Sequence, residues 1–140
     1  MEIKSTYNLF LDDERMPRDA FNYTKDFDYN LLEWVIVRNY KQFCETIEAK
    51  FKFNEWPVVV SFDHDLQGEH YEIAEKSGFK DFDYSLIKEG TGRECAKWLT
   101  DFCLDHDLKL PPYKVHSGNT VGKRNILGLL DGFAKFQSKS

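Results

Sequence analysis

Residues 57–63, PVVVSFD, decide the fold, because they form the clearest β-strand in the sequence. Three consecutive valines suit a strand that is buried on both faces, as the strands of a parallel sheet are. The run ends at Asp63, and His64 and Asp65 follow it directly. The stretch therefore predicts an α/β protein with polar side chains at the carboxyl end of a central strand.

Apolar runs on either side predict further strands at residues 7–12 (YNLFLD), 34–38 (WVIVR) and 113–117 (YKVHS). Apolar side chains at helical spacing predict helices over about residues 40–52, from 91 to the vicinity of 106, and over about 121–136. We interpret residues 13–33 as a long loop that allows one turn of helix. Residues 66–90 form a charged insertion, typical of a lid or another functional loop.

This order of elements predicts a mostly parallel sheet of four strands in one domain spanning residues 1–140. Right-handed crossovers place the strands in the order 2-1-3-4. Hydrophobic residues make up 41% of the chain and charged residues 31%, which is typical of a globular protein. The sequence leaves the oligomeric state open.

The formal net charge of −5 argues against a partner such as duplex DNA, which needs a basic surface. It is compatible with a small substrate such as a nucleotide or an RNA end. The sequence has no signal-peptide core and no apolar run long enough to span a membrane. We therefore expect a cytoplasmic protein.

Acidic residues gather where the predicted strands end. In an open parallel sheet, ligands bind beyond the carboxyl ends of the strands, and neighbouring strands lie about 4.8 Å apart. Carboxylates that converge there repel one another, and a divalent cation with oxygen ligands relieves the repulsion. We expect Mg²⁺ or another divalent metal, held by Asp12, Asp13, Asp63 and Asp65. The alternative is that these acids cap turns and face water.

Two histidines also follow strands, His64 after the third and His116 after the fourth. Two imidazoles beside a phosphorus atom can act as general base and general acid, which suits the opening of a cyclic phosphate. The predicted catalytic residues are His64, His116, Asp63 and Asp65.

Phosphate also needs hydrogen-bond donors and positive charge. Backbone N–H groups at a helix N-terminus and nearby cations supply both. The candidates are Arg15, Thr91, Gly92, Ser117, Asn119 and Lys123. For Lys123 the alternative is a solvated helix face.

The acids after the first and third strands resemble those of response-regulator receiver domains, which bind Mg²⁺. A fifth strand with the receiver lysine is missing, and two histidines are added. The sequence more closely resembles cyclic-phosphate processing receiver domains of bacteria and phages. The matching motifs are LDDER with Pro17, FDHDL at 62–66, TG at 91–92, and HSGN at 116–119 with Gly122.

This resemblance implies a small receiver-like (flavodoxin-like) three-layer fold. It also implies a phosphoesterase that acts on a cyclic phosphate of a nucleotide or RNA end, in phage–host conflict or RNA repair. One alternative is a receiver-like module that binds a nucleotide or a protein partner without turnover. A second is a metal-dependent nuclease of the TOPRIM kind, in which Asp63 and Asp65 supply the paired acids.

Overall fold

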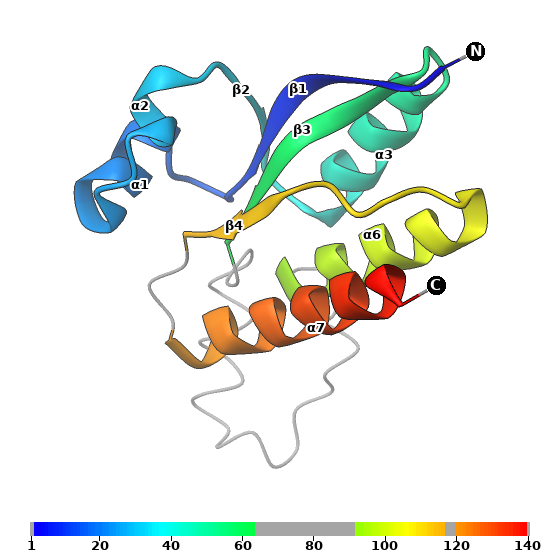
Figure 1. The fold of residues 1–140 in the computed structure, drawn as a ribbon. Coiled ribbons are helices and arrows are strands. Elements are labelled where there is room, and N and C mark those ends of the chain that lie inside the picture. Colours follow the sequence, from blue (N-terminus) through cyan, green and yellow to red (C-terminus); the bar gives the residue numbers. More distant parts are fainter. Residues whose placement is uncertain (1, 64–91, 117–119, 140) are drawn as a thin grey trace, which may run out of the picture.

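The computed structural model describes residues 2–63, 92–116 and 120–139. The strands are β1 (Lys4–Leu11), β2 (Trp34–Val37), β3 (Glu55–Phe62) and β4 (Tyr113–Val115). The helices are α1 (Pro17–Thr24), α2 (Asp28–Leu31), α3 (Tyr40–Phe51), α6 (Gly92–His106) and α7 (Thr120–Ser138) (Figure 1).

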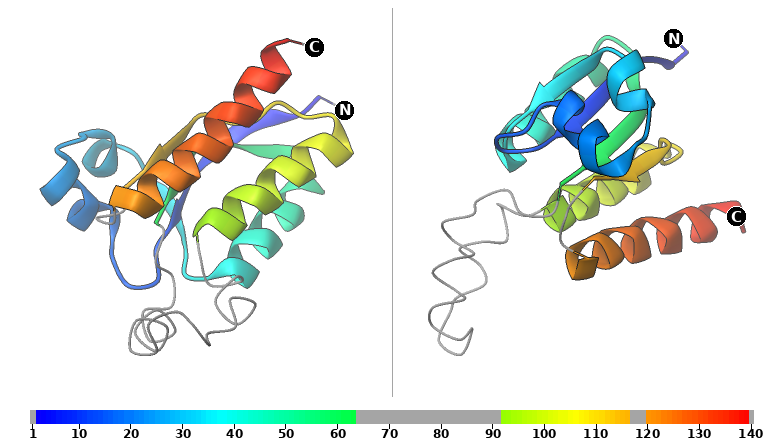
Figure 2. Two further views of the ribbon diagram at one scale, coloured as in Figure 1. Left: turned by 90° about the horizontal axis from the view of Figure 1, so that it is seen from below. Right: turned by 90° about the vertical axis from the view of Figure 1, so that its left-hand side faces the viewer.

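The strands form one parallel sheet in the order β2-β1-β3-β4. The predicted strand order is thereby confirmed, and the described residues add no fifth strand to this sheet. Helices α3, α6 and α7 cover one face of the sheet, and α1 and α2 lie on the other (Figure 2). The result is the receiver-like three-layer arrangement.

The prediction of a loop over residues 13–33 is wrong, because this segment contains both α1 and α2. Pro17 occupies the first turn of α1, where its missing N–H costs nothing, and the Asp19 carboxylate accepts the N–H of Met16 at 2.8 Å. Each helix buries a single residue, Ala20 in α1 and Tyr29 in α2. Helices of 8 and 4 residues are too short for an apolar repeat to be recognised over several turns.

Side chains of each strand alternate between the two faces. In β1, Leu9 and Leu11 join the large core under α3, α6 and α7, whereas Phe10 joins the small core under α1 and α2. In β3, Val60 and Phe62 likewise belong to the large core, so Ser61 between them points to the α1–α2 side. The polar residues that follow β1 and β3 continue this alternation towards the α1–α2 side.

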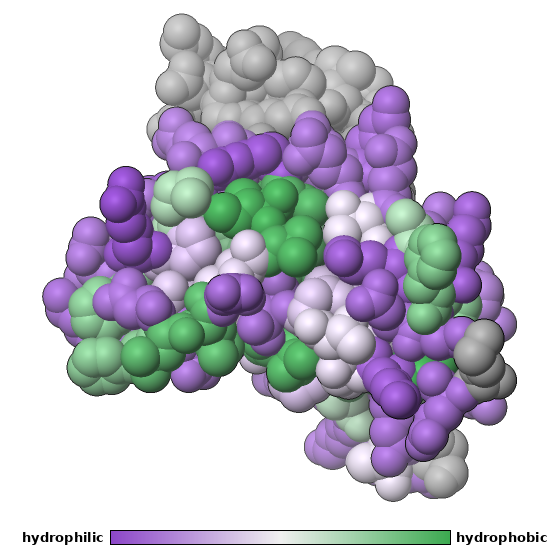
Figure 3. Space-filling view, turned by 90° about the horizontal axis from the view of Figure 1, so that it is seen from above, coloured by the Kyte–Doolittle hydropathy of each residue, from purple (hydrophilic) through white to green (hydrophobic). Residues whose placement is uncertain are grey.

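Seen from above, hydrophobic and hydrophilic residues alternate in small patches over the surface (Figure 3). Among the large hydrophobic side chains exposed on the α1–α2 segment are Phe27 and Leu31, which are 65% and 76% exposed. Within the described residues, no helix has the length and apolar character needed to cross a lipid bilayer.

Candidate active site

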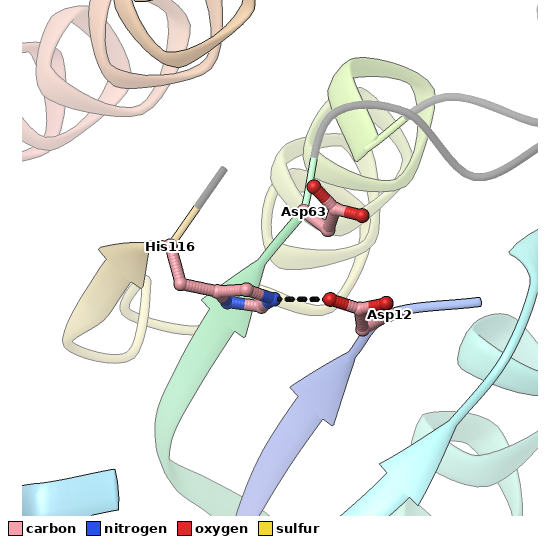
Figure 4. Close-up of side chains that lie close together, drawn as sticks. All are labelled: Asp12, Asp63 and His116. Atoms are coloured by element: carbon pink, nitrogen blue, oxygen red, sulfur yellow. Dashed lines mark hydrogen bonds and ion pairs between the residues drawn. The ribbon is translucent and has the colours of Figure 1, made fainter. Parts of the chain in front are cut away.

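Three polar side chains meet where β1, β3 and β4 end. Asp12, Asp63 and His116 each offer one ligand atom, and these atoms all lie within 4.8 Å of one another (Figure 4). The sheet register aligns them, because the N–H of Asp63 donates to Leu11 and that of His116 donates to Phe62, both at 3.0 Å. All three side chains are buried. The sheet therefore assembles a compact acid–imidazole cluster from distant parts of the chain.

The two oxygens of Asp12 face different groups. Oδ1 accepts the backbone N–H groups of Glu14 at 3.0 Å and Arg15 at 2.9 Å, and Oδ2 lies 3.1 Å from His116 Nε2. Burial acts to raise the pKa of Asp12, but the hydrogen bonds from His116, Arg15 and Glu14 outweigh it and lower this pKa. Asp12 is therefore a carboxylate at neutral pH.

His116 lies fully inside the protein, with a side chain that is 0% exposed. Its Nδ1 lies 2.7 Å from Ser61 Oγ, and its ring stacks on Phe10 with the centroids 4.3 Å apart. Burial lowers the pKa of His116, although the neighbouring Asp12 opposes that change. The ring is thus a neutral imidazole at neutral pH, with both nitrogens engaged by protein groups.

Arg15 brings an exposed positive charge to the loop that follows β1. It donates to the Tyr23 hydroxyl at 3.1 Å, and its guanidinium carbon lies 5.1 Å from the centre of the Tyr23 ring. Burial acts to lower the pKa of Arg15, but the bond to Tyr23 and the charges of Asp12 and Asp63 raise it. The guanidinium is therefore restrained by Tyr23 and lies within the electrostatic reach of both acids of the cluster.

Asp13 belongs to the same loop after β1, and Arg38, which follows β2, binds its backbone. Burial, followed by the nearby charges of Asp12 and Glu14, raises the pKa of the half-buried Asp13 to about 6. Arg38 Nη1 donates to the carbonyl oxygens of Asp12 at 3.2 Å and Arg15 at 2.8 Å, which fixes the loop backbone.

Of the residues predicted from sequence, the structure brings together Asp12, Asp63 and His116, with Asp13 and Arg15 beside them. Gly92 is buried at the start of α6, and Lys123 is exposed in the first turn of α7. The remaining predicted site residues lie outside the described residues: His64, Asp65, Thr91, Ser117 and Asn119.

Sequence analysis missed Ser61, Tyr29 and Arg38. Two of these residues could have been recognised from the sequence. Ser61 is a polar residue inside an apolar strand, and Arg38 directly follows β2. Tyr29 could not, because its contact with the site depends on the unpredicted helix α2.

The sequence model of the family described as "Cyclic-phosphate processing Receiver domain" matches residues 7–132. The chain belongs to this family. The matched region contains Asp12, Asp63 and His116, so the cluster is part of the family's domain, and the membership links the chain to cyclic-phosphate processing. No curated protein and no solved structure matched the chain.

Proposed function

We propose that this chain is a phosphoesterase that opens a cyclic phosphate on a nucleotide or on an RNA end. The observation that carries the proposal is the convergence of Asp12, Asp63 and His116 within 4.8 Å, in a domain of the cyclic-phosphate processing family. In this reaction water attacks phosphorus, one ring P–O bond breaks, and the leaving oxygen takes a proton. The product is an open phosphomonoester.

Arg15 is the residue proposed to bind the phosphate oxygens. Its guanidinium can offer two parallel donors to a phosphate, and Tyr23 already restrains it. Bound there, a phosphate lies next to the acids, whose negative charges need compensation. A cation at those acids favours both the phosphate and the ionised carboxylates.

The cluster fits a divalent metal ion. The carboxylates of Asp12 and Asp63 offer oxygen ligands, which such a cation prefers, and their ligand atoms lie within 4.8 Å of each other. Asp12 and Asp63 are the residues proposed to hold Mg²⁺ or another divalent ion. When bound, such an ion polarises a phosphoryl oxygen.

The proton transfers predicted for His64 and His116 stay predictions, as do the catalytic and metal-binding roles of Asp65 and the phosphate contacts of Thr91, Ser117 and Asn119. The same holds for a setting in phage–host conflict or RNA repair. A second candidate function is a binding module that holds a cyclic nucleotide intact. The observation that favours it is the burial of His116, whose two ring nitrogens are both engaged.

The two functions are separated by incubating the full chain with 2′,3′-cyclic and 3′,5′-cyclic nucleotides and with RNA that ends in a cyclic phosphate. Each substrate is tested with Mg²⁺ and with a chelator, and the products are identified by mass spectrometry. We expect a ring-opened product with the mass of one added water. Intact nucleotide retained in a stoichiometric complex favours the binding module, and neither turnover nor binding contradicts both.

Two variants connect that activity to the site. Asp12→Asn and Arg15→Met are expected to lower the rate of ring opening at least about tenfold, because each removes a charge that faces the phosphate or its cation. The matched control is Arg18→Met, which removes an exposed arginine from α1 three positions along the chain. Equal activity of Arg15→Met and Arg18→Met contradicts the assigned role of Arg15.

A further inference from the structure

A chain of hydrogen bonds continues from the cluster into the protein on the α1–α2 side of the sheet. Asp12 Oδ2 lies 3.1 Å from His116 Nε2, and His116 Nδ1 lies 2.7 Å from Ser61 Oγ. Ser61 Oγ in turn lies 2.6 Å from the hydroxyl of Tyr29. The four side chains are buried, so water does not compete for these bonds.

The groups around His116 favour one arrangement of the protons in this series of hydrogen bonds. Asp12 Oδ1 accepts two backbone N–H groups, as a carboxylate does, and a carboxylate has no proton to donate from Oδ2, so we assign the proton of this contact to His116 Nε2. Nδ1 of a neutral ring is then an acceptor, and the Ser61 hydroxyl donates to it. The oxygen of Ser61 is left to accept from Tyr29, and each hydroxyl has one orientation.

We propose that Ser61 and Tyr29 are positioning residues that lock the His116 ring with its Nε2–H directed at Asp12. Partners of this kind, one step behind a site, set the tautomer and the rotation of a histidine and thereby orient the group that it contacts. Without Ser61, the Asp12 bond and the contacts with the Phe10 and Tyr29 rings are left to oppose rotation of the ring. The importance of this fixed ring orientation for turnover rests on the proposed function, whereas the orientation itself does not depend on it.

Helix α2 carries Tyr29, and the surrounding contacts hold this helix in place. Lys114, two residues before His116, contacts Asp26 Oδ2 at 2.5 Å and Asp28 Oδ2 at 3.0 Å. The Tyr29 ring also stacks on Trp34, with the centroids 5.4 Å apart. Helix α2 therefore places the Tyr29 hydroxyl in a fixed position at the buried end of the series of hydrogen bonds.

The test is ¹⁵N-resolved NMR of the full chain without ligand or added metal. In the wild type we expect the proton of His116 on Nε2, exchanging slowly with solvent because the ring is locked and buried. Tyr29→Phe and Ser61→Ala each remove one hydroxyl from the series of hydrogen bonds. Each is expected to speed the exchange of this proton about tenfold, the factor that corresponds to one lost internal hydrogen bond.

Tyr7→Phe is the matched control, because it also removes a buried tyrosine hydroxyl, and that hydroxyl has no hydrogen-bond partner within the described residues. Leu31→Ser alters an exposed residue of α2, the helix that carries Tyr29. Both controls are expected to leave the exchange of the His116 proton unchanged. A wild-type proton on Nδ1, or exchange that neither Tyr29→Phe nor Ser61→Ala alters, overturns the proposal.

Turnover gives an independent measurement. If the chain opens cyclic phosphates, Ser61→Ala is expected to lower kcat about 10- to 100-fold with little change in KM, because it disturbs orientation rather than binding. A change in KM alone contradicts the positioning role. If the chain shows no turnover, the proposed function fails, and the exchange measurement still decides whether the lock exists.

Discussion

Asp12 combines a structural role with a proposed chemical one, because its two oxygens face different groups. Oδ1 binds the N–H groups of Glu14 and Arg15 and so folds the loop after β1, while Oδ2 faces His116. Arg38 supports the same loop from β2 by binding two of its carbonyl oxygens. Asp12 is therefore placed by contacts with neighbouring residues and by two long-range contacts, one from His116 to its carboxylate and one from Arg38 to its carbonyl oxygen.

Arg38→Met tests the long-range support. The variant removes both donor bonds and leaves the carbonyls of Asp12 and Arg15 without these partners, so the free energy of unfolding is expected to fall by about 1–3 kcal/mol. Urea unfolding monitored by tryptophan fluorescence measures the change. Arg18→Met, at an exposed position of α1, is the control and is expected to stay within about 0.5 kcal/mol of the wild type. Equal stabilities of the two variants contradict the role of Arg38.

Asp13 makes stability depend on pH. Burial and the charges of Asp12 and Glu14 raise its pKa in the folded chain from 3.8 to about 6. As the pH rises, the unfolded chain loses this proton first, so Asp13 destabilises the fold progressively between about pH 4 and pH 6 and by a constant amount above that. Asp13→Asn is expected to raise the melting temperature at pH 7.5 and to leave it unchanged at pH 3.5. An equal effect at both pH values contradicts the assignment.

At the scale of elements, sequence analysis succeeds where burial is periodic. The β3 valines and the apolar faces of α3, α6 and α7 predicted these elements to within a few residues, and the strand order followed from crossover handedness. It failed at α1 and α2, which have 8 and 4 residues and bury one residue each. The contact of Tyr29 with the site could not be predicted, because it requires α2 to exist and to lie against β3.

Lys114 in β4 forms ion pairs with Asp26 and Asp28 and thereby holds α2 next to β4. Because the partners are carboxylates, this stabilisation depends on pH. The hydrogen bond from Lys114 lowers the pKa of Asp26 below 3.8 in the folded chain. A depressed carboxyl pKa stabilises the fold above the unfolded-state value, and the stabilisation is lost as the pH falls through the folded-state value. Lys114→Met is therefore expected to lower stability at pH 7 by about 1 kcal/mol, since the pair is partly exposed.

The difference between the wild type and Lys114→Met is expected to shrink below about pH 4, where Asp26 gains its proton. Chemical unfolding at several pH values measures it. Lys97→Met is the matched control, because Lys97 pairs with Asp101 at 2.9 Å on an exposed helix face. Its effect is expected to stay below about 0.5 kcal/mol. A Lys114→Met effect that is independent of pH contradicts the proposed anchoring.

At the scale of the whole molecule, the site is a product of the topology. Asp12 and His116 are 104 positions apart, yet they touch because β1 and β4 flank β3 in one parallel sheet. The sequence predicted this convergence, because strand ends in a parallel sheet share one edge. It did not predict the burial of His116, whose ring lies against those of Phe10 in β1 and Tyr29 in α2.

A cation that binds Asp12 and Asp63 together ties β1 and β3 to each other at the ends of the two strands. It therefore stabilises the folded chain over the unfolded chain, in which these residues are far apart. A divalent ion at 100 times its dissociation constant adds about 2.7 kcal/mol of stability. For a domain of this size the melting temperature is then expected to rise by roughly 5–15 °C.

Thermal unfolding with Mg²⁺, with Mn²⁺ and with a chelator measures this rise. Asp12→Asn and Asp63→Asn each remove one charged ligand from the cluster and are expected to abolish it, because a carboxamide is a neutral and weaker ligand for a hard cation. Asp105→Asn, at an exposed position near the end of α6, is expected to keep the full rise. A rise that survives in both cluster variants means that the ion binds elsewhere, and no rise in the wild type contradicts the metal site itself.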